Sequence, residues 1–161
     1  MVEQKPSSGE RQKLIEQISG TVMRWQDATQ RFDETVGEIF SLSAAERLCL
    51  SFLFSGPKTA SAIARQTRLT PAAITAMIDR LERRGFVNRT ADPTDRRKVL
   101  VAPGEMAHKL ARDIYGPVAE AGTGMLSRYS EAELRAVARF ATDGVKVQEW
   151  MTEDLIARQK K

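Results

Sequence analysis

The spacing of apolar residues along this chain changes at Gly85 from a helical period to a strand period. Before Gly85, four apolar residues recur at the spacing of one helix face: Ile74, Met77, Ile78 and Leu81. Thr70 and Pro71 suit the start of that helix, and Gly85 suits a left-handed end. After Gly85, residues 86–90 and 98–101 have the composition of two short strands joined by a polar turn. The pattern predicts a helix that leads directly into a β-hairpin.

Shorter helices are predicted before this unit. Ser43 and Glu46 have the spacing of a capping box, which opens a short apolar helix. Thr59 is the expected cap of another helix that starts at about Ala60. The order of helix, short helix, turn, helix and hairpin over residues 43–101 is that of a winged helix-turn-helix.

Long helices are predicted on both sides of residues 43–101. From about residue 10, apolar positions repeat every four and three residues: Ile18, Val22, Trp25, Thr29, Phe32 and Val36. Two helices follow the hairpin, the first weakened by Pro117, Gly122 and Gly124, the second opened by a capping box at Ser130. We therefore expect a mostly α-helical fold with a small β-hairpin, after a flexible tail at residues 1–9.

Positive charge is concentrated in the middle of the chain. Residues 57–104 carry 10 basic and 4 acidic side chains, whereas the whole 161-residue chain has a net charge of +4. A basic segment of this kind suits an anionic partner, although a solvated surface with a chance excess is an equal reading of the charge alone.

Several classes of site and location are excluded or disfavoured by composition. Cys49 and His108 are single residues of their kinds, so we expect no disulfide and no Cys/His zinc site, and we predict no metal or cofactor. The longest apolar run is far shorter than the roughly 20 residues that cross a bilayer. The first residues lack the apolar stretch of a secretory signal, so we expect a cytoplasmic protein without membrane contact.

Residues 69–89, with the run D-R-L-E-R-R-G-F-V-N-R at 79–89, are followed by D-P-T-D-R-R-K at 92–98. This combination closely resembles the MarR family of bacterial transcription regulators, and the resemblance extends over residues 10–157. It implies a single unit in which residues 43–101 form the winged helix-turn-helix. Residues 10–41 and 104–157 would then be the dimerisation helices.

The resemblance also implies which residues face DNA. Ala72, Ala73, Thr75, Ala76 and Arg80 fall on exposed positions of the recognition helix, and Thr70 starts that helix. Arg97 falls where such proteins insert an arginine into the minor groove, with Asp95 bracing it and Arg96 and Lys98 beside it. The chain departs from the family pattern at Ala76, where an arginine is common, and at residues 101–104, where the usual Leu-Thr ending is absent.

Two further groups of residues have alternative interpretations. Five residues could line a pocket for a small aromatic effector, although we favour a plain core role: Met23, Trp25, Phe32, Phe40 and Phe52. Cys49 could be a redox sensor, but it lies in an apolar helix without a second cysteine, so we favour a structural role.

These observations lead to a predicted function. The resemblance implies a repressor that binds a pseudopalindromic operator in double-stranded DNA. We expect it to be a homodimer, because the long apolar stripes exceed what one winged domain covers. An enzyme is disfavoured, since the chain has no Gly-rich phosphate loop and no room for a second domain. A winged helix used only for protein–protein contact is the alternative, and the basic tip at residues 96–98 argues against it.

Overall fold

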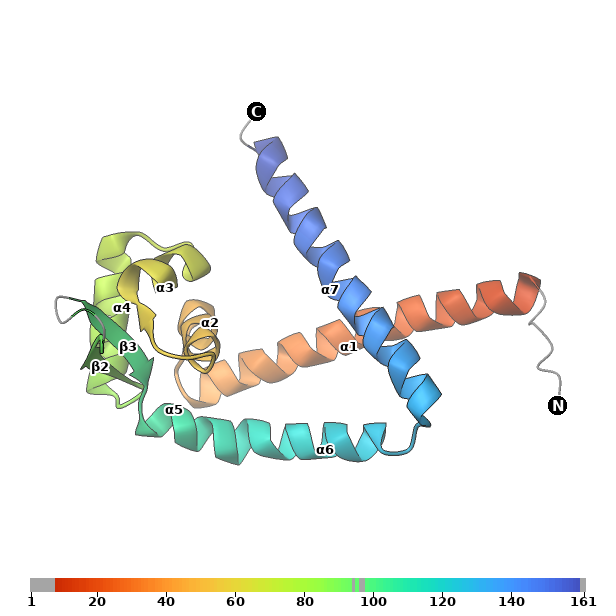
Figure 1. The fold of residues 1–161 in the computed structure, drawn as a ribbon, viewed down its shortest axis with the longest axis horizontal. Helices are drawn as coiled ribbons and strands as arrows, with labels where there is room; N and C mark the ends of the chain where they lie inside the picture. The colour runs from red at the N-terminus through yellow and green to blue at the C-terminus, as the bar shows by residue number, and fades with distance from the viewer. Residues whose placement is uncertain (1–7, 94, 96–97, 160–161) are drawn as a thin grey trace. The chain divides into compact units, whose positions relative to one another are not determined.

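The computed structural model describes residues 8–93, 95 and 98–159. The chain divides into two compact units, residues 1–108 and 109–161, which are described separately below. The first unit (Figure 1) contains α1 (Ser8–Ile39), α2 (Ala44–Leu53), β1 (Lys58–Thr59), α3 (Ala60–Thr67), α4 (Pro71–Arg83), β2 (Val87–Ala91), β3 (Val99–Pro103) and the start of α5 (Glu105–Leu110). The second unit holds the end of α5, η1 (Ala111–Tyr115), α6 (Gly116–Leu126) and α7 (Glu131–Gln159).

The helix starts in the first unit follow the predicted capping residues. At α2, the Ser43 hydroxyl accepts the Glu46 N–H at 3.3 Å, and a Glu46 carboxylate oxygen accepts the Ser43 N–H at 2.8 Å. At α3 and α4, the hydroxyls of Thr59 and Thr70 accept backbone N–H groups at 3.2 and 3.3 Å. These contacts satisfy donors that have no partner within the helix, which is why the three starts could be predicted.

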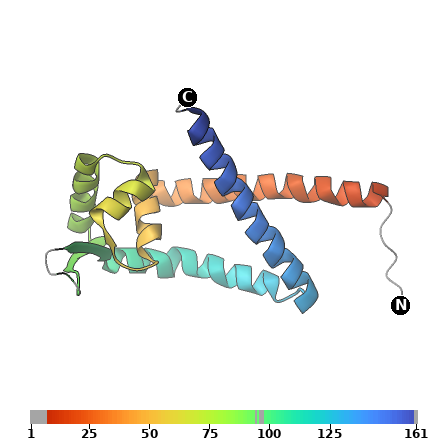
Figure 2. The ribbon, with the colours of Figure 1, turned by 45° about the horizontal axis from the view of Figure 1, so that its top comes forward.

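The predicted hairpin is present and belongs to a three-stranded antiparallel sheet of order β1-β3-β2. β2 pairs with β3 from Val87 opposite Pro103 to Ala91 opposite Val99 (Figure 2). The third strand, β1, was not predicted. It is two residues long and pairs Lys58 with Val101, so it has too few residues to show a strand period in the sequence.

The two ends of the hairpin lie in close contact at Gly85 and Gly104, and this contact is called the strand crossing below. Gly85 has a φ of +72°, the left-handed value predicted for it. The N–H of Gly104 donates to the Phe86 carbonyl at 2.8 Å, and the N–H of Met106 donates to the Gly85 carbonyl at 3.1 Å. A Cβ on Gly104 would lie under 3.0 Å from the Gly85 oxygen, closer than real Cβ atoms come, so the crossing requires glycine there.

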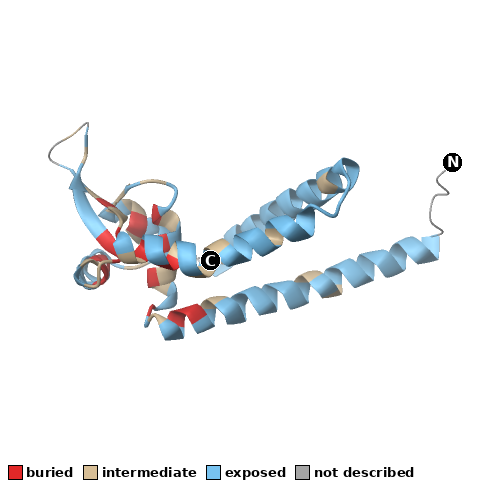
Figure 3. Ribbon diagram, turned by 90° about the horizontal axis from the view of Figure 1, so that it is seen from below, coloured by how far each residue is buried: buried red, intermediate tan, exposed pale blue. Residues whose placement is uncertain are grey.

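The core of the first unit lies where α4 packs against the other short helices and the sheet. The four predicted stripe residues of α4 are all buried: Ile74, Met77, Ile78 and Leu81. They are joined in this core by Leu53, Ile63, Val87 and Val101, all at most 2% exposed. Figure 3 shows that, within the first unit, buried residues gather in this region and at the adjoining end of α1.

The end of α1 is held by an arginine from the end of α4. Arg84 donates through Nη1 to the Ser41 carbonyl at 2.8 Å and through Nη2 to the Phe40 carbonyl, and its guanidinium lies over the Phe86 ring. These carbonyls follow the last turn of α1, where a cation also complements the helix dipole. Arg84 thus ties the end of α4 to the end of α1.

Most of α1 is not covered by the first unit. Val36 is buried beside α2, but three predicted stripe residues are exposed: Ile18 at 47%, Trp25 at 67% and Phe32 at 36%. Met23 is exposed as well. The preference for a buried core role is therefore wrong for Met23, Trp25 and Phe32 within the single chain, where these side chains are exposed.

The second unit begins with a change of helical form. Residues Ala111–Tyr115 make a π turn, and α6 follows it with Pro117 in its first turn. At α7, the predicted capping box is present, with the Ser130 N–H donating to a Glu133 carboxylate oxygen at 2.8 Å. Large apolar side chains of α7 are exposed, including Phe140, Val147 and Leu155. No helix among the described residues is long and apolar enough to cross a membrane.

Candidate nucleic-acid interface

The exposed face of α4 carries small side chains. Ala72, Ala73, Thr75 and Ala76 are all exposed, as predicted for a helix that approaches base edges closely, and so is Thr70 at the helix start. The Thr75 hydroxyl donates to the Pro71 carbonyl at 3.1 Å, which leaves its oxygen lone pairs as acceptors. The opposite face is buried in the core, so this side of α4 is open to a partner.

Arg80 lies on the same side of α4, one turn beyond Ala76 and two beyond Ala73. Its Nε donates to a carboxylate oxygen of Glu46 at 2.9 Å. Glu46 is 2% exposed, whereas the Arg80 side chain is 50% exposed. Burial raises the pKa of Glu46, but hydrogen bonds from the Ser43 N–H and from Arg80 outweigh it and lower that pKa below its usual value. Glu46 is therefore ionised at neutral pH.

The acidic residues of α4 are held by an arginine from the sheet. Arg89 of β2 forms ion pairs with Asp79 through Nη2 and with Glu82 through Nη1, and its backbone N–H donates to Glu82 at 3.3 Å. The hydrogen bond that Arg89 donates to Asp79 raises the pKa of Arg89, and the two carboxylates compensate its charge. These two ion pairs hold the hairpin against α4.

The tip of the hairpin is described in part. The Asp92 N–H donates to the Lys98 carbonyl at 3.0 Å, and the Lys98 N–H donates to the Asp95 carbonyl at 2.8 Å. The Asp95 carboxylate also pairs with Lys98 Nζ at 3.6 Å. Arg96 and Arg97 lie outside the described residues, so the bracing of Arg97 by Asp95 stays a prediction.

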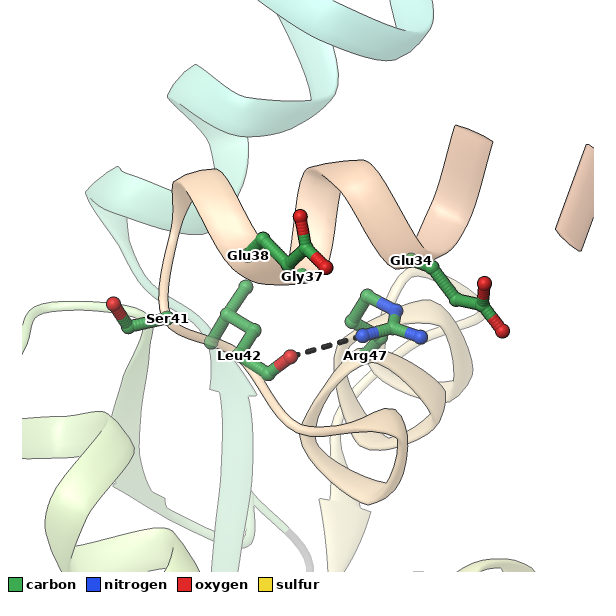
Figure 4. Close-up of a pocket in the computed structure, with 6 residues that line it drawn as sticks. All are labelled: Glu34, Gly37, Glu38, Ser41, Leu42 and Arg47. Atoms are coloured by element: carbon green, nitrogen blue, oxygen red, sulfur yellow. Dashed lines mark hydrogen bonds between the residues drawn. The ribbon is translucent and has the colours of Figure 1, made fainter. Parts of the chain in front are cut away.

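A cavity of about 390 Å³ lies beside the turn between α1 and α2 (Figure 4). It is lined by Glu34, Gly37, Glu38, Ser41, Leu42 and Arg47. Arg47 lies across the end of α1 and donates to the Leu42 carbonyl at 2.9 Å. A Cβ on Gly37 would collide with the Arg47 guanidinium, so glycine permits this placement.

None of the five residues predicted for an effector pocket lines this cavity. Phe40 and Phe52 are half-buried, and Met23, Trp25 and Phe32 are exposed. The aromatic pocket stays a prediction. Cys49 is fully buried, and desolvation raises the pKa of its thiol to about 11, which agrees with the structural role favoured for it.

Comparisons with known proteins identify the family of this arrangement. The family model described as the MarR family matches residues 45–99, which contain α2 without its first residue, β1, α3, α4, β2 and the first residue of β3. YcgE of Bacillus subtilis (strain 168), named an uncharacterized HTH-type transcriptional regulator, is 34% identical over 101 residues. That alignment covers 63% of this chain and 66% of YcgE, slightly under two thirds of that relative. Residues 45–99 belong to the MarR family.

Solved structures share the fold of this chain. YusO from Bacillus subtilis is 21% identical with a TM-score of 0.58, and the match covers 88% of this chain and 99% of YusO. A single-substitution mutant of S. aureus MepR, solved bound to an oligodeoxyribonucleotide, is 19% identical with a TM-score of 0.52, covering 80% and 94%. MepR bound to ethidium bromide is 18% identical with a TM-score of 0.61, covering 81% and 95%.

The match makes residues 45–99 a MarR-family unit, and the relative YcgE is named an HTH-type transcriptional regulator. Three residues that position the candidate interface were missed by sequence reasoning: Glu46, Arg84 and Arg89. Glu46 was identified only as a helix cap, and the partners of all three become visible only when elements distant in sequence are brought together.

Proposed function

We propose that this MarR-family protein is a repressor that binds a pseudopalindromic operator as a homodimer. The observation that carries the proposal is the exposed face of α4, where Ala72, Ala73 and Ala76 leave the helix backbone accessible to base edges. Arg89 compensates the acidic charges of α4, which would otherwise repel phosphates. A MepR mutant of the same fold was solved bound to an oligodeoxyribonucleotide, which supports DNA as the partner.

The dimer rests on apolar area that the chain leaves exposed. Trp25 of α1 and Trp150 of α7 are each more than 60% exposed, and both helices carry further exposed apolar residues. Contact of such surface with water is unfavourable by about 25 cal/mol per Å², so a second copy is the expected cover. Light scattering at micromolar concentration should give twice the 18.0 kDa chain mass, and a monomer would contradict the dimer.

The wing is proposed to probe the minor groove through Arg97, with Arg96, Lys98 and Asp95 at the same tip. Two recognition helices in successive major grooves place half-sites about 10–10.5 base pairs apart. Footprinting on the DNA that flanks the gene should therefore protect an imperfect palindrome. Arg97→Ala should weaken binding there by about 1–3 kcal/mol per subunit and flatten the salt dependence.

The alternative is a winged helix that contacts only proteins. A salt series on duplex DNA separates the two, because phosphate contacts make binding weaken steeply as salt rises. If the folded protein does not bind the flanking DNA at low salt, the protein-contact function is the better one. If Arg97→Ala binds as tightly as the wild type at about 150 mM salt, the wing is not a minor-groove probe.

We further propose that a small aromatic molecule releases the protein from DNA in the cytoplasm. MepR, which has the same fold, was solved bound to the aromatic cation ethidium, and Phe40 at the α1–α2 turn and Phe52 at the end of α2 are half-buried. A thermal-shift screen with aromatic acids and aromatic cations tests this. The absence of any compound that both raises the melting temperature and weakens DNA binding would contradict it.

A further inference from the structure

A buried carboxylate stands behind the exposed face of α4. Glu46 lies in the first turn of α2 and is 2% exposed, and 34 positions separate it from Arg80 in the sequence. Its two oxygens have separate partners: Oε2 accepts the Ser43 N–H at 2.8 Å, and Oε1 accepts Arg80 Nε–H at 2.9 Å. A neutral glutamine at position 46 could also accept the Ser43 N–H. The cap alone therefore does not explain a buried negative charge.

The contact leaves the outer end of the Arg80 guanidinium open. A guanidinium has five N–H donors, and only the one on Nε is used by Glu46. Within the described ranges, no carboxylate or carbonyl accepts a hydrogen bond from Nη1 or Nη2 of Arg80. The side chain is half exposed and lies in line with Ala73 and Ala76. Its free pair of amino groups has the geometry that binds a phosphate through two hydrogen bonds.

We propose that Glu46 is a positioning residue for DNA binding, which holds Arg80 by Nε so that the Nη pair meets a backbone phosphate beside α4. The inference rests on the proposed DNA contact of α4. Arginine has a long flexible side chain, and fixing it before binding reduces the ordering that binding requires. If Arg80 instead serves only to neutralise Glu46, the pair would affect folding and not DNA affinity.

Simple electrostatics and the proposal predict opposite changes in DNA affinity for the substitution Glu46→Gln. Glu46→Gln removes a negative charge near the DNA, which by itself should strengthen binding. The amide can still accept the Ser43 N–H, but it then presents its NH₂ group to Arg80 Nε, and two donors do not bind each other. Under the proposal Arg80 is released from its fixed orientation, and binding becomes weaker although the protein has become more positive.

The experiment measures binding to a mixed-sequence duplex of about 30 base pairs at low salt, since phosphate contacts do not require the operator. Glu46→Gln should weaken binding about threefold to tenfold. In an Arg80→Gln background the same change should have no further effect, because Glu46 acts through Arg80. Glu131→Gln is the matched control: it removes a carboxylate from an exposed ion pair with Arg135 on α7, and binding should not weaken.

If Glu46→Gln binds the duplex as tightly as the wild type or more tightly, the proposal is wrong. It is also wrong if Glu46→Gln lowers the DNA affinity equally in the wild-type and Arg80→Gln backgrounds. Melting temperatures show whether each variant is folded at the binding temperature. If Glu46→Gln does not fold, Arg80→Lys decides, because lysine keeps a cation beside Glu46 but has no paired amino groups. Arg80→Lys should bind at least about threefold more weakly, and wild-type affinity would overturn the proposal. Failure of the folded wild type to bind the duplex is a separate result, which refutes the proposed function itself.

Discussion

Gly104→Ala should destabilise the winged unit through steric contact alone. Gly104 does not have a positive φ, so alanine can adopt its backbone conformation. An added Cβ would lie 3.0 Å from the carbonyl carbons of Gly85 and Phe86, and still nearer to the Gly85 oxygen, where ordinary contact begins at 3.4 Å. All of these atoms are backbone, so the strand crossing must open by about half an ångström or more. Two hydrogen bonds should lengthen as a result: the one from the Gly104 N–H to the Phe86 carbonyl and the one from the Met106 N–H to the Gly85 carbonyl.

Overpacking of this kind is typically unfavourable by about 1–3 kcal/mol, and we expect the upper half of that range because no flexible side chain can yield. For a chain of this length the melting temperature should fall by about 4–10 °C, measured by calorimetry at one protein concentration. Gly20→Ala is the control. Gly20 lies within α1, and its nearest neighbour would be Arg24 Nη1 at 3.6 Å, so alanine should stabilise by about 0.5–1 kcal/mol. A Gly104→Ala protein that melts with the wild type would show that the crossing is looser than described.

Four further substitutions or titrations test other contacts. Arg89→Gln leaves both carboxylates of α4 without their cation, so DNA affinity in a titration should fall about tenfold while the melting temperature changes by only a few degrees. Because the thiol pKa of Cys49 is about 11, roughly one molecule in 10,000 is a thiolate at pH 7, and a thiol reagent should label Cys49 only after denaturation; a peroxide response of DNA binding that Cys49→Ser abolishes would refute this. The lowered pKa of Glu46 stabilises the fold above the ordinary glutamate pKa of about 4.3, and that stability is lost as pH falls below it, so Glu46→Gln should flatten acid unfolding curves. Arg68 has a φ of +56° at the end of α3, so Arg68→Gly should raise stability in a denaturant titration by about 1 kcal/mol.

Local signals were sufficient to predict most of the secondary structure. Ser43, Thr59 and Thr70 start their helices as expected, because each capping hydroxyl accepts a backbone N–H that lies only three residues further along the chain. Gly85 ends α4 with the expected left-handed conformation. The α4 stripe was predictable for the same reason, since a period is visible in a short window of sequence.

The parts that were missed depend on contacts between distant residues. Arg80 lies 34 positions from Glu46, and Arg84 lies 43 and 44 positions from the carbonyls that it holds. Nothing near these arginines in the sequence names their partners. For Trp25, the heptad-like spacing showed that an apolar stripe needs a cover, but a period does not specify whether that cover is the same chain or another one.

The outer edge of β2 has a bearing on how this protein avoids aggregation. An unpaired strand edge can recruit a strand from another chain, and five residues are long enough to do so. Here the backbone N–H of Arg89, at the middle of the strand, already donates to the Glu82 side chain, and the guanidinium of the same residue is ion-paired with Asp79 and Glu82 of α4. An incoming strand would have to displace both. Arg89→Gln is expected to weaken DNA binding. Replacement of Arg89 by a β-branched apolar residue should also lower the solubility of the protein, so that fibrillar or amorphous deposits form during expression.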